Sequence, residues 1–130
     1  MNDEARLRIQ AILDLDPGWA AYALADLDPA QDTATEWHVA PGAVVLRYHA
    51  IQPPVLFAQG PPEEVEELFG QVPAGEYLYT LLGTHRAALR RRMEILNEAK
   101  MWRMVLRREA WRPRPGETAA LRASDLGEIE

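Results

Sequence analysis

The sequence predicts an α/β (α+β) fold in which a mixed central β-sheet carries helices on both of its faces. Apolar residues recur at helical spacing in four segments, and short segments rich in β-branched and aromatic residues lie between them. Residues 54–82 run strand, helix, strand, which favours a right-handed crossover and parallel neighbours. The 130 residues, 48% of them hydrophobic, suffice for one ordinary core. The expected element order is α-α-β-β-β-α-β-α-β.

The first 28 residues predict two helices. Asn2 or Asp3 is suited to cap the first helix, and Pro17 is suited to the first turn of the second. Asp28-Pro29 ends the second helix, because a residue before proline avoids helical backbone angles. The expected apolar stripe of the first helix is Leu7, Ile9, Ala11, Ile12 and Leu15. In the second helix, spacings of three and four relate Trp19, Tyr22, Ala23, Asp26 and Leu27.

Three strands are expected next, at residues 35–39, 43–51 and 54–59. Pro41-Gly42 is typical of a turn between the first two, so these strands form an antiparallel meander. The middle strand alternates in character along its length. Its two faces carry Val44, Leu46 and Tyr48 on one side, and Val45, Arg47 and His49 on the other.

The remaining elements follow the same rules. Residues 61–69 predict a helix that starts at paired prolines and stops at Gly70. Residues 77–82 predict a buried strand, and Thr84 is suited to cap a helix over residues 85–96. Residues 100–108 alternate and predict a long, half-exposed strand. The expected inner face of the last helix is Ala88, Leu89, Met93 and Leu96.

The composition changes after this last strand. Residues 1–109 are expected to form one lobe, and residues 110–117 form a linker rich in proline. Residues 118–130 then predict a strand and a helix start that has no body, and a helix of fewer than two turns does not sustain itself. We therefore expect residues 118–130 to be the start of a truncated second domain.

The element order resembles that of the GNAT acetyltransferase superfamily. Residues 120–130 (ALRASDLGEIE) are also similar to the beginning of a GNAT domain, where a strand and a polar turn lead into a helix with the pattern Asp-Leu-x-x-Ile. The resemblance implies a degenerate N-terminal GNAT-like lobe, followed in the same chain by a catalytic domain. That domain would hold acetyl-coenzyme A and transfer its acetyl group to an amine.

The chain departs from the family at the loop that binds the cofactor. GNAT enzymes hold the coenzyme A diphosphate on a Gln/Arg-x-x-Gly-x-Gly/Ala loop, and here the equivalent residues 58–64 read AQGPPEE. Gln59 and Gly60 are present, but Pro61 and Pro62 remove two N–H donors. Four carboxylates follow within the first turns and would repel a diphosphate: Glu63, Glu64, Glu66 and Glu67. We expect no cofactor site and no catalytic residue in this fragment.

Charge and composition exclude several classes of protein. The net charge of −6 argues against a protein that binds nucleic acid through phosphate neutralisation, although the charge is unevenly distributed. Residues 1–70 carry three basic and twelve acidic side chains, whereas residues 71–130 carry eleven basic and eight acidic ones. The chain has no cysteine, no signal peptide and no apolar run long enough to span a membrane, so we expect a cytoplasmic protein. Its histidines, His38, His49 and His85, are not spaced for a metal site.

Two groups of residues are candidates for binding. Arg47 and His49 share a strand face that would line a ligand pocket with Tyr77 and Tyr79, one of whose hydroxyls could act as an acid. The alternatives are a solvated strand face and two tyrosines packed in the core.

The second group is basic. Arg86 and Arg90 share a helix face, flanked by Arg91 and Arg92, and predict an anion clamp, a docking surface or a plain solvated face. Trp111 in the linker is a candidate interface anchor.

Three functions remain open from the sequence. The first is a non-catalytic lobe of an N-acetyltransferase that shapes the acceptor site or the dimer interface, with the catalytic domain of the same chain as its partner. The second is a free-standing small-ligand-binding module with a mixed sheet, and the third is an enzyme that is complete in 130 residues. The acetyl acceptor and the oligomeric state stay open.

Overall fold

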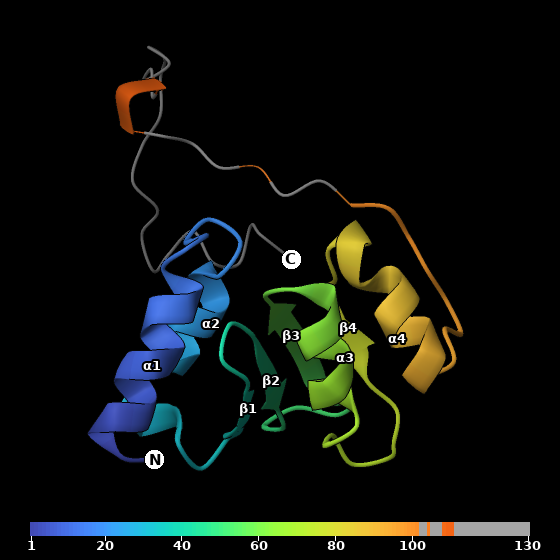
Figure 1. Cartoon of the computed structure of the whole chain (residues 1–130), viewed down its shortest axis with the longest axis horizontal. Coiled ribbons are helices and arrows are strands. Elements are labelled where there is room, and N and C mark those ends of the chain that lie inside the picture. The colour runs from blue at the N-terminus through green and yellow to red at the C-terminus, as the bar shows by residue number, and fades with distance from the viewer. Residues whose placement is uncertain (102–103, 105–107, 111–130) are drawn as a thin grey trace, which may run out of the picture.

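In the computed structural model, which describes residues 1–101, 104 and 108–110, the chain forms three layers (Figure 1). A mixed sheet lies between α1 (Asp3–Leu13) and α2 (Ala21–Asp26) on one face and α3 (Pro62–Phe69) and α4 (Arg86–Arg92) on the other. The predicted fold class, a mixed sheet with helices on both faces, is confirmed. No helix in the described part of the chain is both long enough and apolar enough to cross a membrane.

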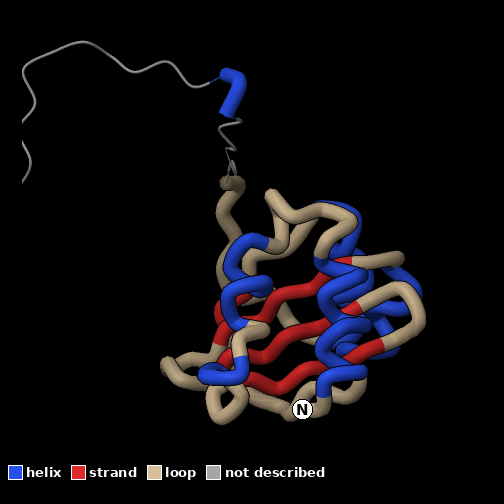
Figure 2. The backbone as a smooth tube through the Cα atoms, turned by 90° about the vertical axis from the view of Figure 1, so that its left-hand side faces the viewer, coloured by secondary structure: helices blue, strands red, loops and turns tan. Residues whose placement is uncertain are grey.

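The sheet contains β1 (Thr35–Val39), β2 (Val44–Tyr48), β3 (Val55–Gln59) and β4 (Leu78–Tyr79), which lie side by side in chain order (Figure 2). The pairs β1–β2 and β2–β3 are antiparallel, and β3–β4 is parallel. The predicted meander and the parallel pair that follows it are therefore both present. β1 and β4 form the two edges of the sheet.

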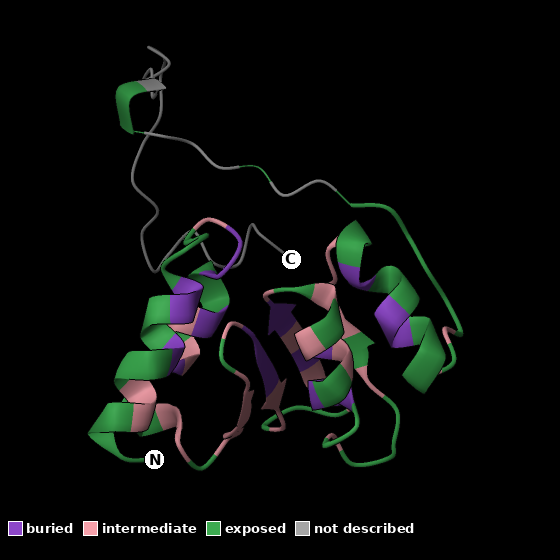
Figure 3. Cartoon of the chain, viewed as in Figure 1, coloured by how far each residue is buried: buried purple, intermediate pink, exposed green. Residues whose placement is uncertain are grey.

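The alternation in β2 supplies two separate hydrophobic cores. Val44 and Leu46 face α1 and α2, whereas Val45 faces α3 and α4, as the sequence predicts. Figure 3 shows the buried positions on the sides of the helices that face the sheet. The first core contains Ile9, Ile12, Leu13, Ala20, Ala23, Leu27, Val44 and Leu46, and the second contains Ala43, Val45, Ala58, Val65, Leu68, Phe69, Ala88 and Leu89.

The start of α1 agrees with the sequence, but its buried stripe is narrower than predicted. The side-chain oxygen of Asn2 accepts a hydrogen bond of 2.8 Å from the N–H of Ala5, so Asn2 is the cap. Leu7 and Leu15, predicted to face inward, are 67% and 81% exposed. Leu7 lies on the outer side of the helix, and Leu15 lies beyond its end. Ala11, also placed on this stripe, is exposed, and so is Tyr22 of the second helix, whereas Asp26 is half-buried.

The second half departs further from the prediction. β4 has only two residues instead of the six expected, and α4 ends at Arg92 because Met93 adopts extended backbone angles (φ −141°, ψ 154°). Thr84 makes no capping bond and instead lies in a 3-10 turn over Gly83–His85. Leu96, predicted to be on the inner face, is 69% exposed.

The predicted strand over residues 100–108 is not found in the residues that the structure describes. Lys100, Met101 and Met104 belong to no strand, and Arg108 begins a 3-10 turn (Arg108–Ala110). The other residues of that prediction, Trp111, the linker beyond Ala110 and the second domain at residues 118–130 lie outside the described residues.

Candidate functional site

The junction between β3 and α3 is the segment that the sequence comparison above aligned with a cofactor loop. Gly60 has a φ of +124°, and a Cβ built on it would lie 2.5 Å from the carbonyl oxygen of Gly42, so the position requires glycine. The Gly60 carbonyl oxygen lies 2.7 Å from Nε2 of His85. Because a carbonyl only accepts, Nε2 carries a proton and is the donor of this bond. Nδ1 of His85 is buried without a partner in the described structure.

The amino end of α3 makes hydrogen bonds within the protein. Pro61 occupies the N-cap position without a capping bond from its side chain, and Pro62 is the first residue of the helix, so neither position supplies an N–H. Glu64 turns back, and its Oε1 accepts a hydrogen bond of 3.0 Å from the N–H of Gly42. The carboxylate of Glu64 thus lies over the turn between β1 and β2, near where an anion would approach the helix end.

The carboxyl end of β3 is covered by the segment around α1 and α2. Nε1 of Trp19 donates to the carbonyl oxygen of Ala58 over 3.1 Å, and its ring stacks on Phe57 with centroids 5.7 Å apart. The buried side chain of Gln59 donates through Nε2 to the carbonyl oxygen of Ile12 over 2.7 Å. The sequence presented Gln59 as a remnant of the cofactor loop, whereas here it joins β3 to the carboxyl end of α1. The signal for this role was a lone amide ending an apolar strand.

The structure brings together only part of the predicted ligand pocket. The guanidinium of Arg47 lies 5.9 Å from the ring centroid of Tyr77 and 3.7 Å from a carboxylate oxygen of Glu36. Tyr77 donates from its hydroxyl to the carbonyl oxygen of Pro73. His49 lies beyond the end of β2, and its backbone N–H donates to Ala34 over 2.9 Å. None of these side chains lines either of the two cavities described below.

Tyr79 belongs to the core. Its ring meets Phe69 edge-on at a centroid distance of 5.8 Å, and its hydroxyl is buried without a hydrogen-bond partner in the described structure. Burial raises the pKa of this hydroxyl far above its ordinary value. The group is therefore neutral at all physiological pH values and is surrounded by apolar side chains.

The arginines of α4 line a larger open cavity. Together with residues 93–98 they surround about 610 Å³. Arg86 donates to both carboxylate oxygens of Glu98, at 2.8 and 2.9 Å, and Arg91 pairs with Glu66. Among the described residues, neither Arg90 nor Arg92 has an ion-pair partner within 4.0 Å.

The electrostatics of this cavity centre on Glu98. The hydrogen bond from Arg86 and the nearby charges of Arg86, Arg90 and Lys100 hold the pKa of Glu98 below its ordinary value. The protein's own carboxylate thus already occupies one guanidinium of the predicted clamp. Of the two guanidiniums of that clamp, the one on Arg90 remains for an added anion.

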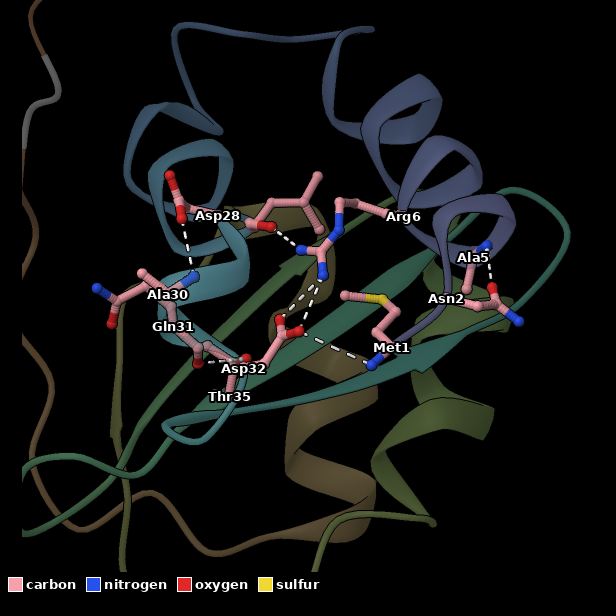
Figure 4. A network of polar contacts seen from close by, with 10 residues as sticks. Met1, Asn2, Ala5, Arg6, Asp28, Ala30, Gln31, Asp32 and Thr35 are labelled. Carbon is pink, nitrogen blue, oxygen red and sulfur yellow. Dashed lines mark hydrogen bonds and ion pairs between the residues drawn. The ribbon is translucent and has the colours of Figure 1, made fainter.

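A network of polar contacts holds the start of α1 against the turn before β1 (Figure 4). Arg6 donates to both carboxylate oxygens of Asp32, at 2.9 and 3.1 Å, and also to the carbonyl oxygen of Leu27. The amino terminus of Met1 lies 3.8 Å from Asp32. Beside this network, a cavity of about 280 Å³ follows β1 and is lined by Met1, Ala5, Ile9, Asp32, Thr35, Trp37 and Val39.

Within the described residues, no three acidic or histidine side chains are grouped so that they could hold a metal ion. Comparison with protein-family models, with curated proteins and with solved structures found no match for this chain.

Proposed function

We propose that residues 1–109 form a non-catalytic lobe of a GNAT-type N-acetyltransferase, which shapes the acceptor site or the dimer interface of the enzyme. By resemblance, a second domain of the same chain would carry acetyl-coenzyme A and transfer its acetyl group to an amine. The observation that supports the non-catalytic role is the β3–α3 junction. A cytoplasmic location is part of the same proposal.

A diphosphate binds at a helix end through free backbone N–H groups and the positive end of the helix dipole. Pro61 and Pro62 remove two of these donors from the end of α3. Glu63 and Glu64 place two carboxylates in its first turn, and like charges about 4 Å apart repel by about 1 kcal/mol even in bulk water. These features of the β3–α3 junction therefore favour a role in which the lobe acts through its surfaces and not through a bound nucleotide.

Calorimetric titration of the chain with acetyl-coenzyme A tests whether the β3–α3 junction binds a diphosphate. We expect no binding up to millimolar ligand. An Arg90→Ala variant serves as the control, because it distinguishes a weak contact of the phosphates with α4 from binding at the β3–α3 junction. Protection of the amides just after Gly60 on addition of the ligand would contradict the proposal.

The coding sequence beyond Glu130 tests the assignment to an acetyltransferase. The proposal expects a downstream Gln/Arg-x-x-Gly-x-Gly/Ala motif between a strand and a helix. A stop codon directly after Glu130 would exclude a catalytic domain in the same chain.

A small-ligand-binding module is the second candidate, and the cavity beside α4 favours it. Arg90 and Arg92 line about 610 Å³ of open space without an ion pair of their own among the described residues. This chemistry suits a small carboxylate or phosphate. Stabilisation by such anions in a thermal-shift screen, abolished in Arg90→Ala but not in Arg8→Ala, would favour this function.

A further inference from the structure

β1 is a long edge strand whose outward backbone groups have no partner in the described structure. The N–H of Ala40 donates to Ala43, and the N–H of His49 donates to Ala34, both over 2.9 Å. In an antiparallel pair, every second residue of a strand hydrogen-bonds to its neighbour. These two bonds show that the even-numbered residues of β1 are the ones that bond to β2. The N–H and C=O groups of Thr35, Trp37 and Val39 therefore point away from the sheet.

Apart from the charged side chain of Glu36, β1 lacks the features that usually protect an edge. Its five residues pair with β2 without a bulge, and the strand contains no proline, glycine or lysine, the features that usually blunt an edge. All five residues are half-buried, in contrast to the fully buried start of β2. The opposite edge, β4, has only two residues. β1 is thus the edge at which the sheet is able to extend.

We infer that a second copy of this chain pairs with β1 in antiparallel fashion, about a two-fold axis at Trp37, to give one continuous sheet through both copies. The inference deepens the assembly role proposed above and to that extent rests on it. In this register Trp37 faces Trp37 of the other copy, and Thr35 faces Val39. The outward N–H and C=O groups of these residues then bond to one another.

Charge selects this register over its neighbours. With the axis at Trp37, Glu36 of each copy lies opposite His38 of the other at a non-hydrogen-bonded pair, where side chains are closest. An axis at Glu36 would set two carboxylates against each other, and an axis at His38 would set two imidazoles together. Each of those registers also overlaps only three residues of β1, whereas the Trp37 register overlaps all five.

The pairing of Glu36 with His38 across the axis also identifies the partner as a second copy of this chain. In the Trp37 register the carboxylate of Glu36 meets the imidazole of His38 from the other copy on both sides of the axis, so the strand is matched by an identical strand. A two-fold axis makes adjoining edge strands antiparallel. On the α1 side, the cavity of about 280 Å³ lined by Thr35, Trp37 and Val39 leaves space beside the edge. The indole Nε1 of Trp37, buried there without a partner in the described structure, also faces a new neighbour in the dimer.

Cysteine pairing tests the register in a chain that has no natural cysteine. A mixture of Thr35→Cys and Val39→Cys chains is expected to form a covalent heterodimer on mild oxidation. Opposed Cα atoms at such a pair lie about 5.5 Å apart, within the range of a disulfide. Neither variant alone is expected to crosslink, since residue 35 lies four positions from residue 35 of the other copy. Efficient crosslinking of Thr35→Cys with itself would overturn the register.

Sedimentation equilibrium of the full chain tests the association itself. We expect a monomer–dimer equilibrium whose dissociation constant rises about tenfold in Glu36→Lys, because both symmetric contacts between the Glu36 carboxylate and the His38 imidazole are lost. The double variant Glu36→Lys/His38→Glu is expected to return close to the original value, which a loss of folding would not do. A chain that stays monomeric at every concentration overturns the inference, whether or not it binds coenzyme A. Coenzyme A binding at the β3–α3 junction, in contrast, overturns only the proposed function.

Discussion

Nε2 of His85 donates a hydrogen bond of 2.7 Å to the carbonyl oxygen of Gly60 and thereby joins the entrance of α4 to the end of β3. His85 is almost fully buried, at 1% exposure. The two residues are 25 positions apart in the chain, so this bond closes the β3–α3–β4–α4 unit. Its loss is expected to loosen that whole half of the protein.

We expect His85→Ala to lower the free energy of unfolding by about 2–4 kcal/mol, because it leaves a buried carbonyl oxygen unpaired and opens a cavity. Urea denaturation measures the change. Thr84→Ala, at the exposed neighbouring residue, is the control and is expected to change stability by less than about 0.5 kcal/mol. An equal effect of the two substitutions would show that the bond to Gly60 contributes nothing.

Gly60→Ala is expected to cost about 3 kcal/mol or more, since φ is +124° and the new Cβ would meet Gly42 and Ala43 at 2.5–2.6 Å. Gly83→Ala is the matched control, because a Cβ there has no neighbour within 4 Å. The thermal midpoints of the two variants should therefore differ clearly. A Gly60→Ala protein as stable as Gly83→Ala would contradict the backbone described here.

The ion pair between Arg86 and Glu98 should be sensitive to acid. Because the hydrogen bond from Arg86 lowers the pKa of Glu98, the pair is fully formed above the ordinary carboxyl pKa of 4.5 and is lost as pH falls through the lowered value. An NMR titration of the Glu98 carboxyl carbon measures that midpoint.

Arg86→Gln should move this midpoint back toward 4.5, whereas Arg8→Gln, on α1, should leave it unchanged. A midpoint for Glu98 that is the same with and without Arg86 would show that the two side chains are not paired in solution.

Tyr79→Phe is expected to keep or raise stability, by up to about 1–2 kcal/mol, because it removes a buried hydroxyl that has no partner in the described structure. Tyr79→Ala should instead cost about 3–5 kcal/mol, since the ring fills the core against Phe69. Chemical denaturation of the two variants measures both changes in stability. A clear loss of stability in Tyr79→Phe would reveal a polar partner for the hydroxyl.

The first half of the fold was predictable because its signals are local. Each signal predicts the structure of the residues that carry it. Asn2 marks a helix start, Pro41-Gly42 marks a turn, and the alternation from Val44 to Tyr48 marks a strand. Residues 77–82 and 93–96 carry equally apolar patterns, but a strand or helix there depends on neighbours to pack against. Leu78 is exposed at the sheet edge, and the backbone becomes extended at Met93. The sequence pattern alone therefore predicts a strand and a helix that are both longer than those in the structure.

The candidate site was less predictable, because its contacts join distant segments. The sequence presents His85 and Gln59 as polar residues in ordinary places, and only the fold sets them against Gly60 and Ile12. The guanidinium of Arg47 lies 5.9 Å from the ring centroid of Tyr77, which precedes β4, although β3 separates β2 from β4 in the sheet. The pairing of Arg86 with Glu98 depends on the path of residues 93–98, which no periodicity describes.

The division of β2 between the two cores has a consequence for how this protein tolerates change. Val44 and Leu46 serve one core and Val45 serves the other, so a single inserted or deleted residue in this strand would exchange the side chains of both at once. Substitutions of similar size should be accepted at each of these positions, but a shift in length should not. A one-codon insertion or deletion within the five residues of β2 would therefore disturb the layers on both faces of the sheet together.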